Sequence, residues 1–531
     1  MPAPSLRQDI QQAPLGMVGS SKFGRYPKIS VEQTWNMLIS DNCLVPYAGY
    51  KDVVTVDATV PGRGIYSSSR GGIILAVYGS QAYIFNTALS ATFIGNLNTN
   101  SGDVFLSENN NAEIAFTDGA YVYVYNYLTT TFKVSGTDFS LPAGLSSPGY
   151  ISFQNGRLIL ANNGTTNWYL SAFNNAISWP STANSVGALQ SKPDKIQAAV
   201  PTPGGGNTLY LFGHNVIEQW QDVGTALFPY QRASTFNVDY GTLNASSIAA
   251  LDNYVVWLAG NEQSGATVMI INNGQSKQIS TDGINFKLTN LNNPENCTGF
   301  LFRQDGHVIY QFTFLDDNLS YILDLETGMF FNVSDENLNY HIARNVVFFN
   351  NDYYFVSLRG GNLYQFGTQY TDADYGSEGI KQLPRLRVTP PFRLPSQRMF
   401  IIKSVGFTIE NGQPNIETTA SHETPGVGIN ITTENSLDLL TEGGVEIVEE
   451  DDTGPTITYV TYSEVVDLSV SRDGGETFGP SWRLDMNRTG NRKSRFIWQR
   501  IGQANDATFQ FRFSGFGRFV IADEGIIEHY L

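Results

Sequence analysis

A short β-hairpin that recurs along the middle of the chain is the feature that most constrains the fold. In each copy two runs of β-branched or aromatic residues meet at a tight turn, as at Asn155-Gly156 and Asp305-Gly306. Such pairs supply the positive φ angles that two-residue hairpin turns need. The turns lie near residues 79, 118, 155, 213, 252, 305 and 351, at intervals of roughly 40 to 60 residues. Because one hairpin cannot bury both its faces alone, the repeat predicts a β-propeller of six or seven blades.

The composition agrees with an all-β protein. Of the 531 residues, 41% are apolar and 13% aromatic, whereas only 15% are charged, and Gly occurs 51 times. Strands and tight turns have such a composition, and long surface helices do not. No segment shows a sustained apolar period of 3.6 residues, so we expect few helices.

The pattern divides the chain into four parts. We expect an extended N-terminal arm with an entry strand over residues 1–61, and the β-propeller over residues 62–368. Residues 369–398 are rich in proline and predict a linker. Strand patterns resume over residues 399–531, where the length and spacing favour a β-sandwich-like domain. An acidic insert, Glu442–Asp452, interrupts that domain, and we interpret it as a solvated loop.

The sequence contains no pattern typical of a catalytic or metal centre, and we predict no catalytic residue, no metal ligand and no cofactor. Cys43 and Cys297 are far apart, so a disulfide framework or a thiolate metal site is not expected. No Walker-type or Rossmann glycine pattern, nucleophile elbow or HExxH sequence is present. The histidines lack metal-ligand spacing: they are His214, His307, His341, His422 and His529.

One motif resembles the Asp-box hairpin of sialidases. Its residues are Ser471, Asp473, Gly474, Gly475, Thr477 and Phe478. The Asp473 carboxylate can bond the amides of its own turn while the glycines take positive φ, so we interpret the motif as a folding device. A sialidase-like enzyme would repeat the box in several blades and would need clustered arginines. Here the box occurs once, outside the repeats, so an enzyme is not predicted.

The net charge and the apolar runs of the sequence limit the classes of function that we consider. The net charge of −17 argues against a protein that wraps nucleic acid in basic side chains. A lumen of like charge could still surround a sliding duplex without gripping it. The first residues contain no apolar core of a signal peptide, and no run of 18 apolar residues predicts a membrane span. We therefore expect folding in a cytoplasm.

Motifs spread in order from Pro46 to Gly502 resemble the packaged-DNA stabilisation proteins of short-tailed bacteriophages, also called the tail hub or nozzle. The motifs are Pro46-Tyr47-Ala48-Gly49, Arg63-Gly64-Ile65, Lys192-Pro193-Asp194, Leu211-Phe212-Gly213, Ile217-Glu218 with Trp220, Asp305-Gly306-His307, and Arg495, Trp498, Arg500 and Gly502. Their order along most of the chain makes the resemblance specific.

The resemblance implies a structural protein of the virion tail, assembled in the host cytoplasm. It implies a hexameric ring below the portal and its attached adaptor protein, with genomic DNA enclosed on the ring axis without sequence-specific binding. Such a ring would stabilise the packaged genome, take part in its ejection, and offer sites for a tail needle or plug and for tail fibres or spikes.

Three residues of the last motif are candidates for subunit contacts. Arg495, Trp498 and Arg500 could be interface anchors, because Trp and Arg dominate interface hot spots. They could equally be alternate residues of a strand that packs the sandwich core. The alternative function for the whole chain is a glycan-binding or glycan-cleaving, sialidase-like β-propeller.

Overall fold

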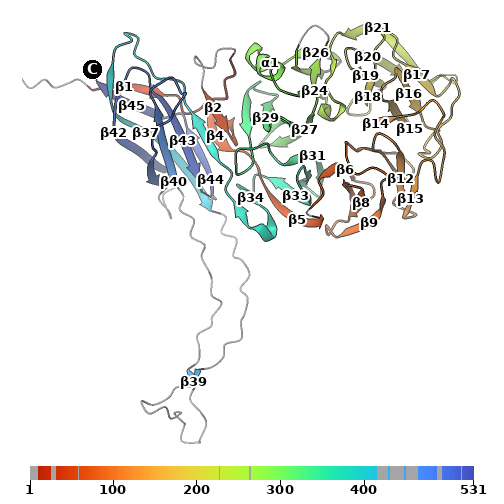
Figure 1. The fold of residues 1–531 in the computed structure, drawn as a ribbon, viewed down its shortest axis with the longest axis horizontal. Coiled ribbons are helices and arrows are strands. Elements are labelled where there is room, and N and C mark those ends of the chain that lie inside the picture. The colour runs from red at the N-terminus through yellow and green to blue at the C-terminus, as the bar shows by residue number, and fades with distance from the viewer. Residues whose placement is uncertain are drawn as a thin grey trace, which may run out of the picture.

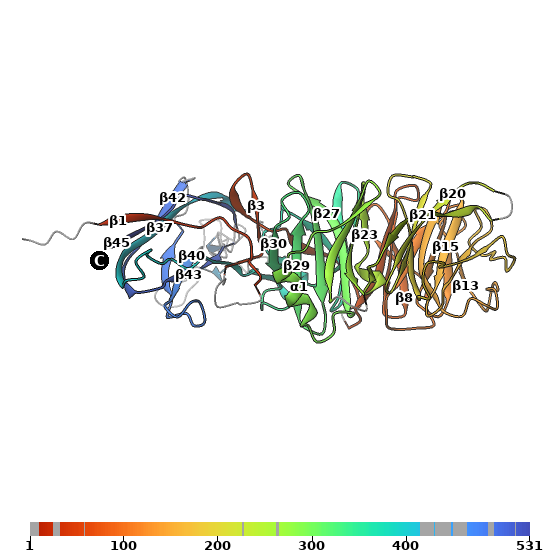
Figure 2. The ribbon, with the colours of Figure 1, turned by 90° about the horizontal axis from the view of Figure 1, so that it is seen from above.

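A computed structural model describes residues 10–24, 32–57, 59–225, 228–261, 265–414, 429–430, 448–449, 465–486, 493–515 and 517–530. Strands dominate this part of the chain. Its helices are one short α-helix, α1 (Asp282–Thr289), and two 3-10 turns, Ala245–Ser247 and Gly376–Glu378. No helix within the described ranges is long and apolar enough to span a membrane. A β-propeller and a β-sandwich lie side by side (Figures 1 and 2).

The propeller has seven blades among the described residues. In six of them the strands follow one another in chain order from the axis outward, and in the seventh the outer strand is β5 from the N-terminal part of the chain. In chain order the blades are β6 (Gly62–Ser68), β7 (Ile73–Tyr78), β8 (Gln81–Phe85), β9 (Ala91–Asn96); β10 (Phe105–Glu108), β11 (Glu113–Thr117), β12 (Val122–Asn126), β13 (Thr131–Val134); β14 (Pro148–Gln154), β15 (Arg157–Asn162), β16 (Asn167–Leu170), β17 (Val186–Ala188); β18 (Ile196–Pro201), β19 (Thr208–Gly213), β20 (Ile217–Asp222), β21 (Tyr230–Val238); β22 (Gly241–Thr242) with β23 (Ala249–Leu251), β24 (Tyr254–Gly260), β25 (Thr267–Asn272), β26 (Gln275–Gln278); β27 (Cys297–Gln304), β28 (His307–Phe314), β29 (Leu319–Asp324), β30 (Phe330–Val333); and β31 (Ala343–Phe349), β32 (Asp352–Ser357), β33 (Gly361–Gly367) with β5 (Gly49–Asp57).

Each predicted hairpin falls in a different blade, which confirms the propeller. At Asn155-Gly156 the φ angles are 49° and 83°, and at Asp305-Gly306 they are 50° and 90°, as two-residue turns require. The intervals between hairpins are uneven for a simple reason. In four blades the hairpin joins the first and second strands, whereas in three it joins the second and third.

Neighbouring blades bury one another. Every pair of adjacent blades shares its own cluster of buried apolar side chains, including the pair formed by blades 7 and 1. The largest of these side chains, among them Trp168 and Trp257, are fully buried. Burying one large apolar side chain stabilises a fold by about 1.5–3 kcal/mol, so the stacking of blades supplies the core that a single blade lacks.

The N-terminal part of the chain closes the propeller. Strand β5 pairs antiparallel with β33 and forms the outer strand of blade 7, with Gly49 opposite Gly367 and Asp57 opposite Gly361. The propeller therefore begins at Gly49 and not at residue 62, because its last blade takes one strand from the start of the chain.

The sandwich consists of two packed sheets. In one sheet the long strand β37 (Phe400–Pro414) pairs with β42 (Lys493–Ala504) on one side and with β44 (Gly517–Ala522) and β45 (Gly525–Tyr530) on the other. This sheet also takes up β1 (Gln11–Leu15), β3 (Met37–Ser40) and β4 (Cys43–Pro46). The facing sheet contains β36 (Arg385–Val388), β43 (Thr508–Ser514), β40 (Val465–Ser471) and β41 (Trp482–Asp485).

The described part of the N-terminal segment is not the free arm that the sequence led us to expect. Strand β2 (Gln33–Trp35) lies between β30 of blade 6 and β36 of the sandwich. The result is one nine-stranded sheet that runs from the propeller into the sandwich. Strands this short carry no periodic pattern of their own, and their partners lie at the far end of the chain, so the sequence did not reveal them.

Residues 369–398 also do more than link two domains. Strands β34 (Ala373–Asp374) and β35 (Ile380–Lys381) extend the sheet of blade 7, and β36 enters the sandwich. The acidic insert Glu442–Asp452 lies outside the described residues except for β39 (Val448–Glu449), which pairs with β38 (Ile429–Asn430).

Candidate functional site

The loops at the two ends of the propeller differ in the number of acidic residues they carry. One end carries the connections between blades and the turns between second and third strands, because the strands of each blade alternate in direction. The described acidic residues there are Asp103, Asp118, Asp138, Asp194, Asp239, Asp282, Glu295, Asp316, Asp317, Asp335 and Glu336, against Lys192, Lys195, Lys287 and Arg359. The loops at the other end carry Asp252, Asp305, Glu326 and Arg70, and the strand ends beside those loops add Glu108, Glu113, Asp222, Asp324 and Asp352. We call the first end the acidic end.

Aromatic side chains from the innermost strands pack together near the propeller axis. Phe105 and Tyr150 come from the innermost strands of blades 2 and 3, and their ring centroids lie 4.9 Å apart. Both rings also pack against the apolar cluster of blades 4 and 5. Burial raises the pKa of Tyr150 to about 12, as expected for a phenol inside an apolar cluster.

The Asp-box residues form a turn stabilised by its own side chains, between β40 and β41. The Asp473 carboxylate accepts hydrogen bonds from the Ser471 hydroxyl at 2.6 Å and from the Thr477 hydroxyl at 2.5 Å. It also accepts from the backbone N–H of Thr477 at 3.0 Å. These bonds, the one from Ser471 first, hold the pKa of Asp473 well below its ordinary value. Gly474 and Gly475 take φ angles of 80° and 92°, and Phe478 is half-buried.

Arg472, inside the same turn, has a role that the sequence analysis missed. Its guanidinium donates to the backbone oxygens of Ile501 at 2.7 Å and Gln503 at 3.1 Å. Both oxygens belong to β42, which pairs with β37 along one edge. Open strand edges invite unwanted pairing, so Arg472 covers part of one. An arginine within a turn motif gives no sequence signal for such a contact.

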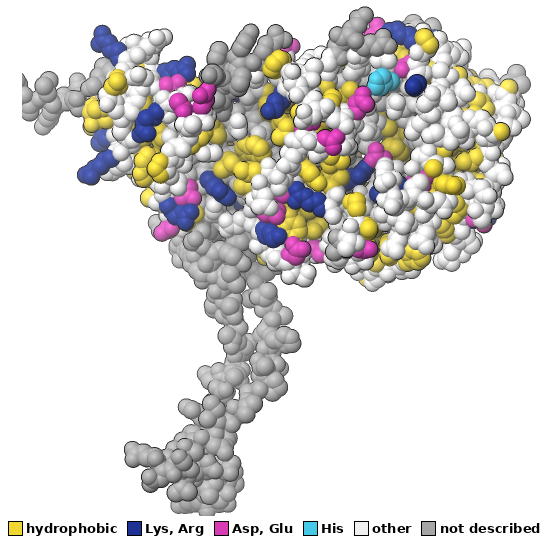
Figure 3. Space-filling model, in the orientation of Figure 1, with side chains coloured by type: hydrophobic (Ala, Val, Ile, Leu, Met, Phe, Trp, Pro, Cys, Tyr) yellow, Lys and Arg dark blue, Asp and Glu magenta, His cyan; other side chains and the backbone are white. Residues whose placement is uncertain are grey.

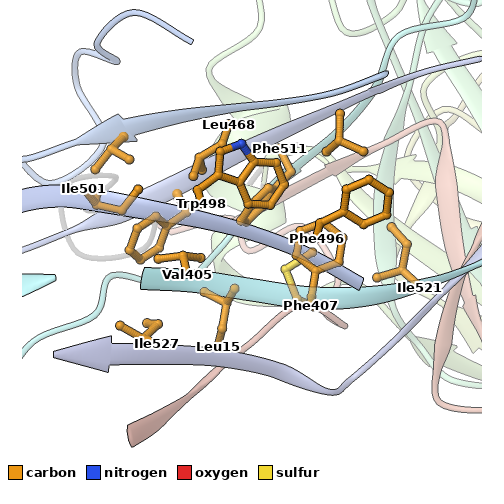
Figure 4. Close-up of a cluster of buried hydrophobic side chains, with 14 of the residues drawn as sticks. Leu15, Val405, Phe407, Leu468, Phe496, Trp498, Ile501, Phe511, Ile521 and Ile527 are labelled. Carbon is orange, nitrogen blue, oxygen red and sulfur yellow. The ribbon is translucent and has the colours of Figure 1, made fainter. Parts of the chain in front are cut away.

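The three residues of β42 that we considered as interface anchors lie in different environments: Trp498 is buried, whereas Arg495 and Arg500 are exposed. Trp498 is 4% exposed and lies in the sandwich core with Phe407, Phe496 and Phe511 (Figure 4). Its indole N–H donates to the backbone oxygen of Trp482 at 2.9 Å. Trp498 is therefore a core residue of the sandwich, which agrees with the second of the two interpretations given above, a strand residue that packs the sandwich core.

Arg495 and Arg500 are exposed, and the structure gives neither an ion-pair partner within the described residues. Arg500 stands at a strand irregularity with a φ of 60°. Figure 3 shows Lys and Arg side chains gathered at the sandwich end of the face it displays. The two arginines thus stay candidates for contacts outside the chain.

Arg495 also borders a groove on the outward face of the same sheet, with a volume of about 810 Å³. Along the floor, Ile497, Gly406, Ile526 and Pro14 lie side by side on four adjacent strands. Ile497 is 40% and Ile526 38% exposed. Because Gly406 has no side chain, it leaves a hollow between the two isoleucines.

Three polar side chains at the contact between sandwich and propeller have the spacing of a Ser-His-Asp relay. His307 Nε2 lies 3.1 Å from Ser40 Oγ, and His307 Nδ1 lies 3.0 Å from the Asp324 carboxylate. Asp324 also accepts from the Thr327 hydroxyl at 2.7 Å. Neither the sandwich groove nor a hollow of about 190 Å³ between blades 4 and 5 includes any of these residues. The arrangement fastens the β3–β4 hairpin to blade 6.

The remaining candidate groups do not form a site. Cys297 is buried and Cys43 half-buried, and both are free thiols. His341 and His529 are buried, His214 is half-buried in a turn, and His422 lies outside the described residues. Across the described ranges, no group of three or more His, Cys, Asp or Glu could hold a metal ion.

The chain thus forms a closed propeller joined through a shared sheet to a sandwich, and the polar groups described above serve turns and domain contacts. Residues 24–371 match the family model described as "Bacteriophage P22 Gp10, beta-propeller", and residues 445–526 match "Bacteriophage P22 Gp10, beta-sandwich". The chain belongs to this bacteriophage P22 Gp10 family and is a structural component of a phage tail. The propeller match begins before residue 62, as the position of β5 requires.

Solved structures resemble the chain only distantly. A streptogramin B lyase is 13% identical, with 60% of this chain and 97% of that chain covered and a TM-score of 0.40. The virginiamycin B lyase from Staphylococcus aureus is 12% identical, with 67% and 98% covered and a TM-score of 0.39. The WD40 propeller domain of Doa1 is 13% identical, with 61% and 98% covered and a TM-score of 0.39. Scores this low carry no argument. No curated protein matches.

Proposed function

We propose that the chain is the tail hub, or nozzle, of a short-tailed phage. In this proposal, copies assembled in the host cytoplasm form a hexameric ring below the portal and its adaptor protein. The ring encloses genomic DNA, stabilises the packaged genome and takes part in ejection. It also offers sites to a tail needle or plug and to tail fibres or spikes. A cyclic ring with head-to-tail contacts is an ordinary solution for such an assembly.

The observation that carries this proposal is the match to the P22 Gp10 family in both domains. Two features of the chain support it. The aromatic packing near the propeller axis favours a DNA channel between subunits rather than through one propeller. The acidic end would repel the phosphates of a duplex, so that DNA could slide past it without binding.

Phage that lack this protein provide the test. In cells infected with a null mutant, we expect heads that package DNA and then lose it, so that the genome becomes sensitive to added nuclease. Expression of the wild-type chain in the host should restore nuclease-resistant, infectious particles. Null-mutant particles that keep their genome and infect normally would contradict the proposal.

The alternative of a glycan-binding or glycan-cleaving propeller is not favoured. The Asp-box turn contacts its own backbone and strand β42, and the family match points to a structural role.

A further inference from the structure

The described N-terminal residues 10–24 and 32–57, which we call the N-terminal strap, are paired with both domains. Strand β1 adds to β45 of the sandwich, and β5 closes blade 7 of the propeller. Between them β2 pairs in parallel with β30 of blade 6 and antiparallel with β36 of the sandwich. The strap therefore contacts each domain by main-chain hydrogen bonds at two or more places.

Arg387 holds the strap on the sandwich side. Its fully buried guanidinium donates to the backbone oxygens of Met17 at 2.8 Å and Gly16 at 2.9 Å, and to the Thr34 hydroxyl at 3.1 Å. It forms an ion pair with Glu32 at 2.6 Å. All four partners belong to the strap. A buried guanidinium needs such partners, because losing them leaves an uncompensated charge in a dry environment.

Asn36 holds the strap on the propeller side. Its backbone N–H donates to the oxygen of Asn332 at 2.9 Å, and its side-chain oxygen accepts from the backbone N–H of Ser334 at 2.8 Å. Its side-chain N–H groups donate to the Ser334 hydroxyl and to the backbone oxygen of Pro384, both at 2.9 Å. Asn36 is buried and has a φ of 51°, a conformation that asparagine tolerates better than most residues.

We propose that the N-terminal strap couples the propeller and the sandwich into one cooperative body, with Arg387 and Asn36 as its two fastenings. The domains then do not hinge at residues 369–398, and they unfold together. This inference is independent of the tail-hub proposal, because it concerns the isolated chain.

Scanning calorimetry of the full chain, with hydrogen exchange to assign each domain, tests the coupling. We expect the wild-type chain to unfold in one transition that includes both domains. Arg387→Met should split it into two, with the sandwich unfolding first. Arg393→Met is the control for loss of an arginine that contacts only the sandwich: the half-exposed Arg393 pairs with Asp506 at 2.8 Å, so one transition should be kept.

Two separate transitions in the wild-type chain would overturn the proposal without any variant. So would a single transition in Arg387→Met at a lower midpoint, because Arg387 would then be an ordinary stabilising residue. If Arg387→Met fails to fold, Asn36→Ala provides the same comparison from the propeller side, with two transitions expected.

Discussion

At the scale of single residues, carboxylates that stabilise turns recur throughout the chain. Asp194 accepts the backbone N–H groups of Asn215 at 2.7 Å and Val216 at 3.1 Å. Asp335, which is fully buried, accepts those of Asn337 at 2.9 Å and Asn339 at 2.8 Å. Each bond satisfies an amide that a tight turn would leave unpaired. Such acidic residues therefore stabilise the turns in which they lie.

The buried His341 predicts sensitivity to acid. Burial lowers its pKa to about 3 despite nearby Asp335, which raises it, whereas an unfolded chain has a histidine pKa of about 6.5. Between these values the unfolded chain binds a proton that the folded chain excludes. The contribution of His341 to stability is therefore fully present above about pH 6.5, and it falls by about 1.4 kcal/mol for each pH unit between that value and about pH 3.

His341→Gln should flatten the dependence of the unfolding free energy on pH between about 6.5 and 4, as measured by urea denaturation. His214→Gln is the control. His214 lies in the turn between β19 and β20, and its replacement should leave the pH dependence of the unfolding free energy as in the wild-type chain. An unchanged slope in His341→Gln would show that His341 accepts a proton in the folded chain.

The Asp box gives a second prediction at this scale. Asp473→Ala should lower the thermal midpoint of the chain, because the turn amides and two hydroxyls lose their acceptor. Asp485→Ala, on the next strand, should leave the midpoint unchanged. Differential scanning fluorimetry of both variants is sufficient, and an unchanged midpoint in Asp473→Ala would show that the turn does not need its carboxylate.

At the scale of single elements, strand β42 shows how alternation decides the role of each residue. Trp498→Ala should cost about 3–5 kcal/mol of unfolding free energy, because a large side chain leaves the core. Arg495→Ala should change it by no more than about 0.5 kcal/mol. Urea denaturation of the isolated chain measures both. A large loss in Arg495→Ala would contradict its placement on the outward face.

The sequence revealed elements whose pattern is local and missed those whose partners are distant. The turns at Asn155-Gly156 and Asp305-Gly306 indicate a hairpin from only a few neighbouring residues, so the blades could be predicted. Strand β2 has three residues, and nothing near it indicates that blade 6 and the sandwich pair with it. The buried roles of Asn36 and Arg387 were missed for the same reason, because polar residues at short strands suggest a surface.

The candidate site could be predicted only in part. The Asp-box turn follows from its residue types, and its geometry agrees with a folding role. Arg495 and Trp498 are three residues apart, a spacing that puts them on opposite faces of a strand, yet the sequence led us to consider them together, as interface anchors or as core residues. The groove floor joins Ile497, Gly406 and Ile526 from three strands, so it exists only in the folded sheet.

At the scale of the whole molecule, the acidic end of the propeller predicts an electrostatic effect on ejection. Replacing Asp239 and Glu295 together by Lys should slow genome ejection from virions, because the new cations attract phosphates. Glu326→Lys, at the opposite end, is the control and should have no effect. The slowing should weaken as salt is added, since the screening length falls to about 10 Å at 0.1 M. Equal kinetics in all virions would contradict the placement of the acidic end beside DNA.

The central claim is that this chain forms the ring that closes a phage tail, and its copy number in the virion tests it most directly. Quantitative mass spectrometry of purified virions can count this chain against the portal protein. A closed hexameric ring predicts about six copies for each portal ring of about twelve. Absence of the chain from virions, or a copy number that fits trimeric fibres, would contradict the account.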